Sequence, residues 1–192
     1  VPLCEEIAGA SGNGRSAQAC LDWLLQTDFL IVALDDRREW YRYHQLLQDL
    51  LRARAGAELG VDQVTDLHRR AAAWFARQGL IEEALQQALA AHDFEQSAAL
   101  MQQALCSVLN REDAATLRHW LALLPEDFRR RRSGLLLIEA WVLHFAYRLG
   151  ETVQVLLQVE TLLAAHAETM VAEEVQLQRG QVLALRAHIA LY

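Results

Sequence analysis

The residues that could do chemistry are scattered along this chain. Its seven histidines occur singly, and the three cysteines lie far apart. Metal sites usually draw on ligands at short spacings, such as Cys-x-x-Cys or His-x-x-x-His, and neither spacing occurs here. We therefore expect no structural metal.

Catalysis by paired carboxylates or by a cysteine is not expected either. The acidic pairs are sequence neighbours, which point about 100° apart on a helix instead of converging as a general acid and base do. These pairs are Glu5-Glu6, Glu82-Glu83 and Glu173-Glu174, and we interpret them as solvated faces. Cys106 lies within an apolar helical pattern, which favours a buried, inert thiol, and Cys4 and Cys20 are interpreted in the same way. We predict that the chain is not an enzyme.

A phosphate-binding P-loop is excluded because the chain contains no lysine, the residue that such a loop places on the β and γ phosphates. Gly9, Gly12 and Gly14 are interpreted as a flexible turn. We expect this segment to bind no cofactor of its own.

The first candidate binding site combines aromatic and basic residues. Trp40 and Tyr41 stand beside Arg42 and His44, so that both kinds of side chain share one surface. The alternative is that His44 is a hydrogen-bonded residue packing a strand against a helix. The other four tryptophans lie among apolar residues at helical spacing and are predicted to be core residues: Trp23, Trp74, Trp120 and Trp141.

The second candidate is the one strongly basic cluster of the chain, formed by Arg129, Arg130, Arg131 and Arg132. It follows Pro125, which marks a corner between helices. Such a run either is a solvated corner or contacts a phosphate or an acidic partner.

The elements that must position the first site form a helix, a hairpin and a second helix. Apolar residues at helical spacing, with Ser11 or Ser16 as a possible N-cap, predict the first helix; an apolar run, a polar turn and an aromatic run predict the hairpin. The predicted ranges are 16–27 for the first helix, 29–34 and 40–43 for the strands, 35–38 for the turn and 44–55 for the second helix. This order is typical of a winged helix.

Beyond Gly56 and Gly60 the pattern is helical throughout. The predicted helices cover about 66–78, 81–91, 93–109, 113–124, 134–149, 151–166 and 170–191, with Gly79, Gly150 and residues 167–169 as breaks. Small residues such as Ala84 and Ala98 permit the close helix approach of stacked repeats. We predict a mainly α-helical chain with two domains: a winged-helix module with a β-hairpin over 1–58, and a TPR-like helical-repeat array over 59–192, truncated at its C-terminus.

Composition narrows the class of protein further. The chain has 192 residues, 53% of them hydrophobic, a formal net charge of −7 and three cysteines without a disulfide framework. No apolar run reaches the roughly 20 residues that a bilayer demands, and the charge opposes a polyanion such as DNA. The start lacks an initiator Met and a signal peptide, and the end falls within a helical pattern. We expect a cytoplasmic chain, cut at both ends, that contacts neither nucleic acid nor membrane.

Three stretches resemble one family. Residues 34–51 (LDDRREWYRYHQLLQDLL) resemble the winged helix that follows the ATPase domain in the large, MalT-like LuxR-family transcription regulators. Residues 67–94 are similar to the start of that family's helical-repeat region, and residues 117–125 are similar to the family's next segment, although Ser133-Gly134 stands where the family commonly has a proline. The resemblance implies a non-catalytic segment of an ATP-dependent activator, which relays a signal and binds an effector or partner.

For such a segment the resemblance implies several partners. ATP or ADP is expected in the ATPase domain of the parent protein, upstream of this segment, and a small-molecule inducer or a regulatory protein is expected at the repeat array. ATP and the inducer would shift the parent between a resting monomer and an active oligomer. The alternative is a free-standing TPR-like adaptor that binds a protein on its concave face.

One residue role is also implied by resemblance. His44 is similar to the histidine of the Met-His-Asp motif of related signalling ATPases, which the winged helix presents to nucleotide phosphates; Tyr43 and Gln45 depart from that motif. An imidazole can donate a hydrogen bond to a phosphate oxygen and so couple nucleotide state to domain position. His44, with Arg42 as a second candidate, is the predicted nucleotide-state sensor, acting only together with the ATPase domain.

Overall fold

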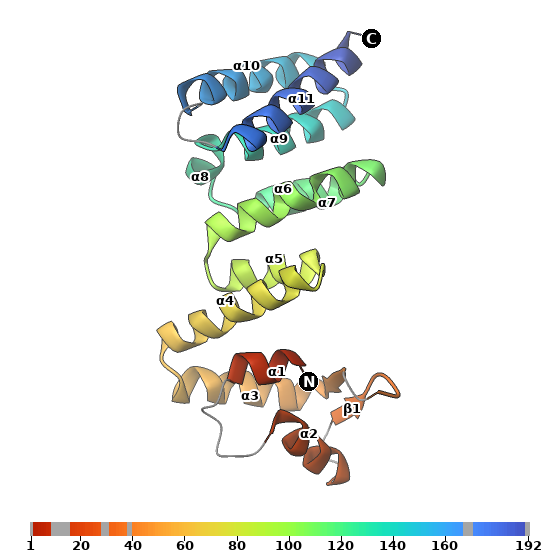
Figure 1. The fold of residues 1–192 in the computed structure, drawn as a ribbon, viewed down its shortest axis with the longest axis vertical. Coiled ribbons are helices and arrows are strands. Elements are labelled where there is room, and N and C mark those ends of the chain that lie inside the picture. Colours follow the sequence, from red (N-terminus) through yellow and green to blue (C-terminus); the bar gives the residue numbers. More distant parts are fainter. Residues whose placement is uncertain (1, 9–15, 28–30, 38–39, 167–170, 191–192) are drawn as a thin grey trace. The chain divides into compact units, whose positions relative to one another are not determined.

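The computed structural model describes residues 2–8, 16–27, 31–37, 40–166 and 171–190 (Figure 1). It divides into two compact units, residues 1–93 and 94–192. These compact units do not test the domain boundary predicted at residues 58/59, which separates a winged helix from a helical-repeat array and stays a prediction.

The first unit begins with helices and a small hairpin, in the order α1 (Pro2–Ala8), α2 (Ala17–Gln26), β1 (Ile31–Ala33), β2 (Tyr41–Tyr43) and α3 (Gln45–Glu58). Ser16 caps α2, since its hydroxyl accepts a hydrogen bond from the Ala19 N–H at 3.2 Å. The strands pair antiparallel, with Val32 opposite Arg42. Helix, hairpin and helix therefore occur in the predicted order.

The first unit continues with α4 (Val61–Arg77) and α5 (Ile81–Ala90), which lie against each other. The contact is made of small and aromatic side chains, since Ala84 and Ala88 are fully buried and Trp74 and Phe75 nearly so. Arg77 of α4 also forms an ion pair with Glu6 of α1. Helix α1 is thereby fixed to the first helical hairpin.

The second unit contains α6 (Phe94–Asn110), α7 (Ala114–Ala122), α8 (Glu126–Arg130), α9 (Ser133–Phe145), α10 (Leu149–His166) and α11 (Ala172–Ile189) (Figure 1). Helix α9 is its centre, because it contacts the five other helices and buries nine of its 13 residues. A mainly helical chain with one hairpin near its N-terminus, followed by a helical array, is confirmed.

Four helices end in the same way. Gly79, His92, Glu112 and Tyr147 have positive φ angles of 74°, 52°, 55° and 56° after α4, α5, α6 and α9. In each case the next residue donates its N–H back to a carbonyl in the last helical turn, as Leu80 does to Phe75 at 3.0 Å and Arg148 to Leu143 at 3.0 Å. This is the Schellman motif, which satisfies carbonyls that a helix end leaves free.

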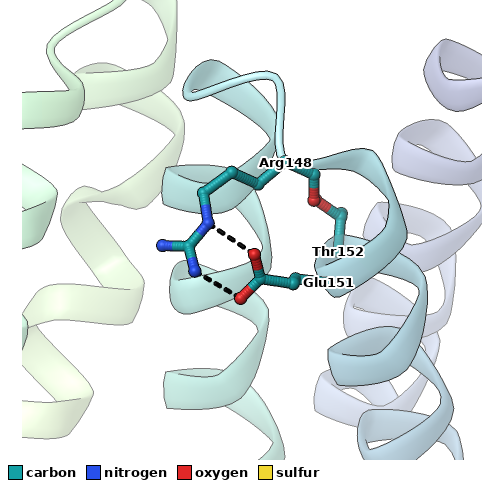
Figure 2. A network of polar contacts seen from close by, with 3 residues as sticks. All are labelled: Arg148, Glu151 and Thr152. Atoms are coloured by element: carbon teal, nitrogen blue, oxygen red, sulfur yellow. Dashed lines mark hydrogen bonds and ion pairs between the residues drawn. The ribbon is translucent and has the colours of Figure 1, made fainter.

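The turn from α9 to α10 corrects a predicted break. The chain leaves α9 at residues 146–148, and Gly150 lies in the first turn of α10 instead of separating the helices. Figure 2 shows how the start of α10 is fixed: Arg148 pairs with Glu151 through two nitrogens, Nε at 2.6 Å, and the Thr152 hydroxyl donates to the Arg148 carbonyl at 3.0 Å. Local hydrogen bonding, not a glycine, sets this boundary.

Two other expectations about burial were wrong. Cys4, Cys20 and Cys106 are all exposed, and Trp23 is 57% exposed. Helices α2 and α6 each bury one side, and Cys20, Trp23 and Cys106 fall on the other, while Cys4 lies at an exposed position of α1. Helical spacing alone does not say which side meets a neighbour. The core positions predicted for Trp74, Trp120 and Trp141 are confirmed.

Some predicted features lie outside the described residues: the possible cap Ser11, the glycines of residues 9–14, the start of the first strand at residues 29–30, part of the turn at residue 38 and the linker 167–169. Over the described residues, no helix combines the length and the apolar character needed to cross a membrane.

Candidate functional site

His44 occupies the N-cap of α3, with φ −60° and ψ 143°. Its Nδ1 accepts a hydrogen bond from the Leu46 N–H at 3.3 Å. An acceptor nitrogen carries no proton, so in this tautomer the proton sits on Nε2. Because His44 is exposed, its imidazole can present an N–H donor to a group outside this chain.

The hairpin places a second set of side chains next to His44. Strand residues alternate between faces, and Val32 pairs with Arg42 while the Leu34 N–H donates to the Trp40 carbonyl at 2.8 Å. Val32, Leu34, Trp40 and Arg42 therefore share one face, which we call the outer hairpin face. All four are exposed, Val32 by 55% and Trp40 by 47%.

The turn of the hairpin is held by Asp35, whose carboxylate accepts from the Trp40 N–H at 2.8 Å. The helix that starts at His44 also exposes apolar side chains, Leu46 by 71% and Leu50 by 61%. The region around His44 and Arg42 thus combines hydrogen-bond donors with exposed apolar area, a composition common at interfaces between domains.

The arginine run is distributed over two helices and their junction. Arg129 and Arg130 belong to α8, Arg131 is its C-cap and Arg132 is the N-cap of α9. The prediction of a corner between helices after Pro125 did not include this short helix.

Carboxylates neutralise part of the run. Arg130 pairs with Glu126 and Arg132 pairs with Glu95, while the Arg132 guanidinium lies 4.7 Å from the centre of the Phe128 ring. The spacing between Glu126 and Arg130 could have been recognised as a helical i,i+4 ion pair, but Glu95 lies too far away in the sequence to have been found. Arg131 remains exposed beside these pairs.

The two predicted sites lie in different compact units, with His44 and Arg42 in the first and the arginine run in the second. Their roles stay predictions. Within the described parts of the chain, no group of three or more histidine, cysteine, aspartate or glutamate side chains is arranged to hold a metal ion.

Comparison with known proteins shows which proteins this chain is similar to. Residues 1–63 match the MalT winged helix domain. The chain is 31% identical over 177 residues to the HTH-type transcriptional regulator MalT of Klebsiella pneumoniae subsp. pneumoniae, and 30% identical over 185 residues to that of Cronobacter sakazakii. These matches cover 92% and 96% of this chain but only 19% and 20% of the two regulators. No solved structure matches significantly. Residues 1–63 are therefore a winged-helix region of the MalT type, and the chain as a whole is homologous to one segment of the MalT regulators.

Proposed function

We propose that this chain is the non-catalytic signal-relay segment of an ATP-dependent transcription regulator, in which the winged helix reports nucleotide state to a helical array that receives an effector or partner. The observation that carries the proposal is the hydrogen bond from the Leu46 N–H to the His44 Nδ1. The N-cap role of His44 fixes a proton on Nε2 of an exposed imidazole, which is the form that donates to a phosphate oxygen.

The proposed partner of the winged helix is an ATPase domain elsewhere in the same parent protein. In support, the chain corresponds to only 19% of a MalT regulator's length, and apolar side chains stand exposed around His44, notably Trp40, Leu46 and Leu50. Burying such area against another domain contributes roughly 25 cal/mol per Å². Arg42, on the outer hairpin face, adds a cation suited to an anionic ligand.

The test uses the full-length parent protein purified with ADP retained, and it must separate the two roles of His44. His44→Ala removes both the cap and the donor. His44→Asp keeps a good N-cap acceptor but cannot donate a hydrogen bond when ionised. We expect both variants to release ADP, with nucleotide released per protein as the readout. Because bound ADP itself stabilises the native state, the cap is tested by melting this chain without nucleotide, where we expect only His44→Ala to lower the melting temperature.

Retention of ADP by His44→Asp would show that His44 serves only as a cap and would remove the sensing role. Arg42→Gln is the matched control on the hairpin, because it removes a charge but leaves the cap intact; we expect a smaller release of ADP. A parent protein whose sequence lacks a P-loop would refute the proposal as a whole and favour a free-standing adaptor.

A further inference from the structure

A cavity of about 500 Å³ opens to the surface of the first unit. It is formed where α1, the hairpin and the end of α4 meet, and its walls include Cys4, Tyr41, Tyr43, Trp74 and Gln78. A volume of this size falls within the range of about 300–1,000 Å³ that small-molecule sites occupy. The cavity is separate from the His44 imidazole, which is not among its lining residues.

Aromatic rings dominate the wall. Trp40, Tyr41, Tyr43 and Trp74 all line the cavity. The Trp74 ring is held by Phe75 in an edge-to-face contact, with ring centroids 5.2 Å apart, and both residues are buried. A ring fixed in this way offers a preorganised surface for stacking against a flat ligand.

No charged side chain occurs among the described residues that line the cavity. A charged ligand would lose its hydration there without gaining a counter-charge, which is costly, whereas a neutral ligand would not. The lack of charged side chains among these lining residues therefore disfavours the binding of an ionic ligand.

Polar groups are present, but they are neutral and few. The Tyr41 hydroxyl accepts a hydrogen bond from Gln18 at 3.1 Å, and a phenol that accepts in this way can still donate its own proton. Burial, with a further effect of Cys4, raises the pKa of Tyr43 above its ordinary value, which favours the neutral phenol. Gln78 adds an amide at the wall.

We propose that this cavity binds a neutral, planar, aromatic or heteroaromatic small molecule carrying one or a few hydrogen-bonding groups. Such a ligand would touch the hairpin through Trp40 and Tyr41 and the first repeat helix through Trp74. It would thus join the winged helix to the helical array within one unit. This proposal does not depend on the nucleotide-sensing role of His44.

The three cysteines provide a direct test in this chain without any substitution. All three cysteines are exposed, but Cys4 lines the cavity whereas Cys20 and Cys106 do not. Cleavage after Arg15, Arg37, Arg77 and Arg111 puts each cysteine in a different peptide, so alkylation by iodoacetamide can be followed for each by mass spectrometry. The probe is N-phenyl-1-naphthylamine, which is neutral, aromatic and fluorescent when it leaves water.

With saturating probe we expect alkylation of Cys4 to slow by about tenfold, because reaction requires access to the thiol, and alkylation of Cys20 and Cys106 to stay unchanged. Equal rates at Cys4 with and without bound probe would overturn the proposal. The anionic dye 1-anilinonaphthalene-8-sulfonate should bind about tenfold more weakly at this position, for want of a counter-charge. Equal protection of Cys4 by both dyes would refute the claim of a neutral ligand.

A matched pair of variants provides the second measurement. Cys4→Trp should fill the cavity and abolish the fluorescence gain of the probe, whereas Cys20→Trp makes the same substitution at an exposed position outside it and should leave binding intact. Circular dichroism verifies the fold of both variants. Undiminished binding by folded Cys4→Trp would place the probe elsewhere and reject the site; if that variant fails to fold, the alkylation result on the unaltered chain decides.

Discussion

Helices α3 and α9 have nearly the same length and a similar supply of leucine, yet their surroundings are opposite. Of the 14 residues of α3 only Leu47 is buried, whereas nine of the 13 residues of α9 are buried. Helix α9 is enclosed by five neighbours, while Leu46 and Leu50 of α3 remain 71% and 61% exposed. Equal leucine content therefore does not mean equal burial, because the neighbours of a helix decide how much of its apolar surface is covered. In our proposal the uncovered apolar surface of α3 serves an interface with another domain.

The largest change in the free energy of unfolding is expected when the same leucine-to-alanine substitution is compared in α9 and α3. Leu137 of α9 is fully buried, so Leu137→Ala should lower the free energy of unfolding by about 2–5 kcal/mol through lost burial and a residual cavity. The same change at exposed Leu50 should alter it by no more than about 0.5 kcal/mol. Urea unfolding followed by circular dichroism measures both. Equal losses would show that α3 is buried in solution and would invalidate the comparison.

The second prediction concerns the polar contact that α9 makes with α11. Ser133 and Gln178 are both buried, and the serine hydroxyl donates to the Gln178 Oε1 at 2.6 Å. Ser133→Ala leaves that oxygen without its donor, at a cost of about 1–3 kcal/mol. The control is Ser107→Ala on the exposed side of α6, expected to be near neutral.

A second substitution sharpens this prediction. Adding Gln178→Leu to Ser133→Ala removes the orphaned acceptor and should restore part of the lost stability. If the double variant is less stable than Ser133→Ala alone, Gln178 contributes to stability through its other contacts. One of these is the hydrogen bond that its Nε2 donates to Glu174 at 3.1 Å. The interaction with Ser133 would then be of minor importance.

The sequence allowed prediction of the order of elements but not of every boundary. Apolar periodicity and the turn residues indicated helix, hairpin, helix and then helices only, and these elements occur in that order, but the short helices α1 and α8 were not predicted. The end of α9, predicted at residue 149 and observed at Phe145, was harder, because Tyr147 adopts a positive φ angle where glycine is usual. Local hydrogen bonds, such as that from the Arg148 N–H to the Leu143 carbonyl, set this end, and periodicity does not report them.

The same limit applies to the candidate site. Trp40, Arg42 and His44 could be singled out from residue types, and the structure places them next to one another on the hairpin and at the start of α3. The capping bond from Leu46 to His44 could not be foreseen, because histidine is not among the common N-cap residues. The cavity beside the hairpin needs Trp74, which lies far along the chain, so no local pattern revealed it.

The positive-φ helix end that α4 and α6 share gives a third prediction. We expect substitutions there to change the free energy of unfolding by about 1 kcal/mol or less. Gly79→Ala forces a Cβ into the left-handed region, where nothing else lies within 4 Å of it, so the cost is conformational and should be about 1 kcal/mol. Glu112→Gly makes the opposite change in the second unit and should raise stability by a few tenths of a kcal/mol, less than the relieved strain because glycine also gains freedom in the unfolded chain. Thermal melting measures both. Loss of stability in Glu112→Gly would mean that the glutamate side chain contributes more than its backbone costs.

The smallest expected effect is a pH dependence at the contact between α9 and α11. Burial, with a further effect of His188, lowers the pKa of His144 below its ordinary value of 6.5, and the two rings lie 5.7 Å apart. The unfolded chain therefore binds this proton more readily, so stability is fully present above about pH 6.5 and declines as the pH falls toward the folded pKa. Asp113, whose pKa is lowered from 3.8 by hydrogen bonds from Thr116, loses its contribution only at much lower pH and does not interfere.

His144→Phe keeps a ring at this position but removes the titration, so its melting temperature should fall less between about pH 7.5 and pH 5 than that of the unaltered chain. His119→Phe, on the exposed side of α7, is the matched control and should keep the original pH dependence. If His144→Phe and the unaltered chain lose stability in parallel over this range, the proton is taken up elsewhere, and the contact between α9 and α11 is insensitive to it.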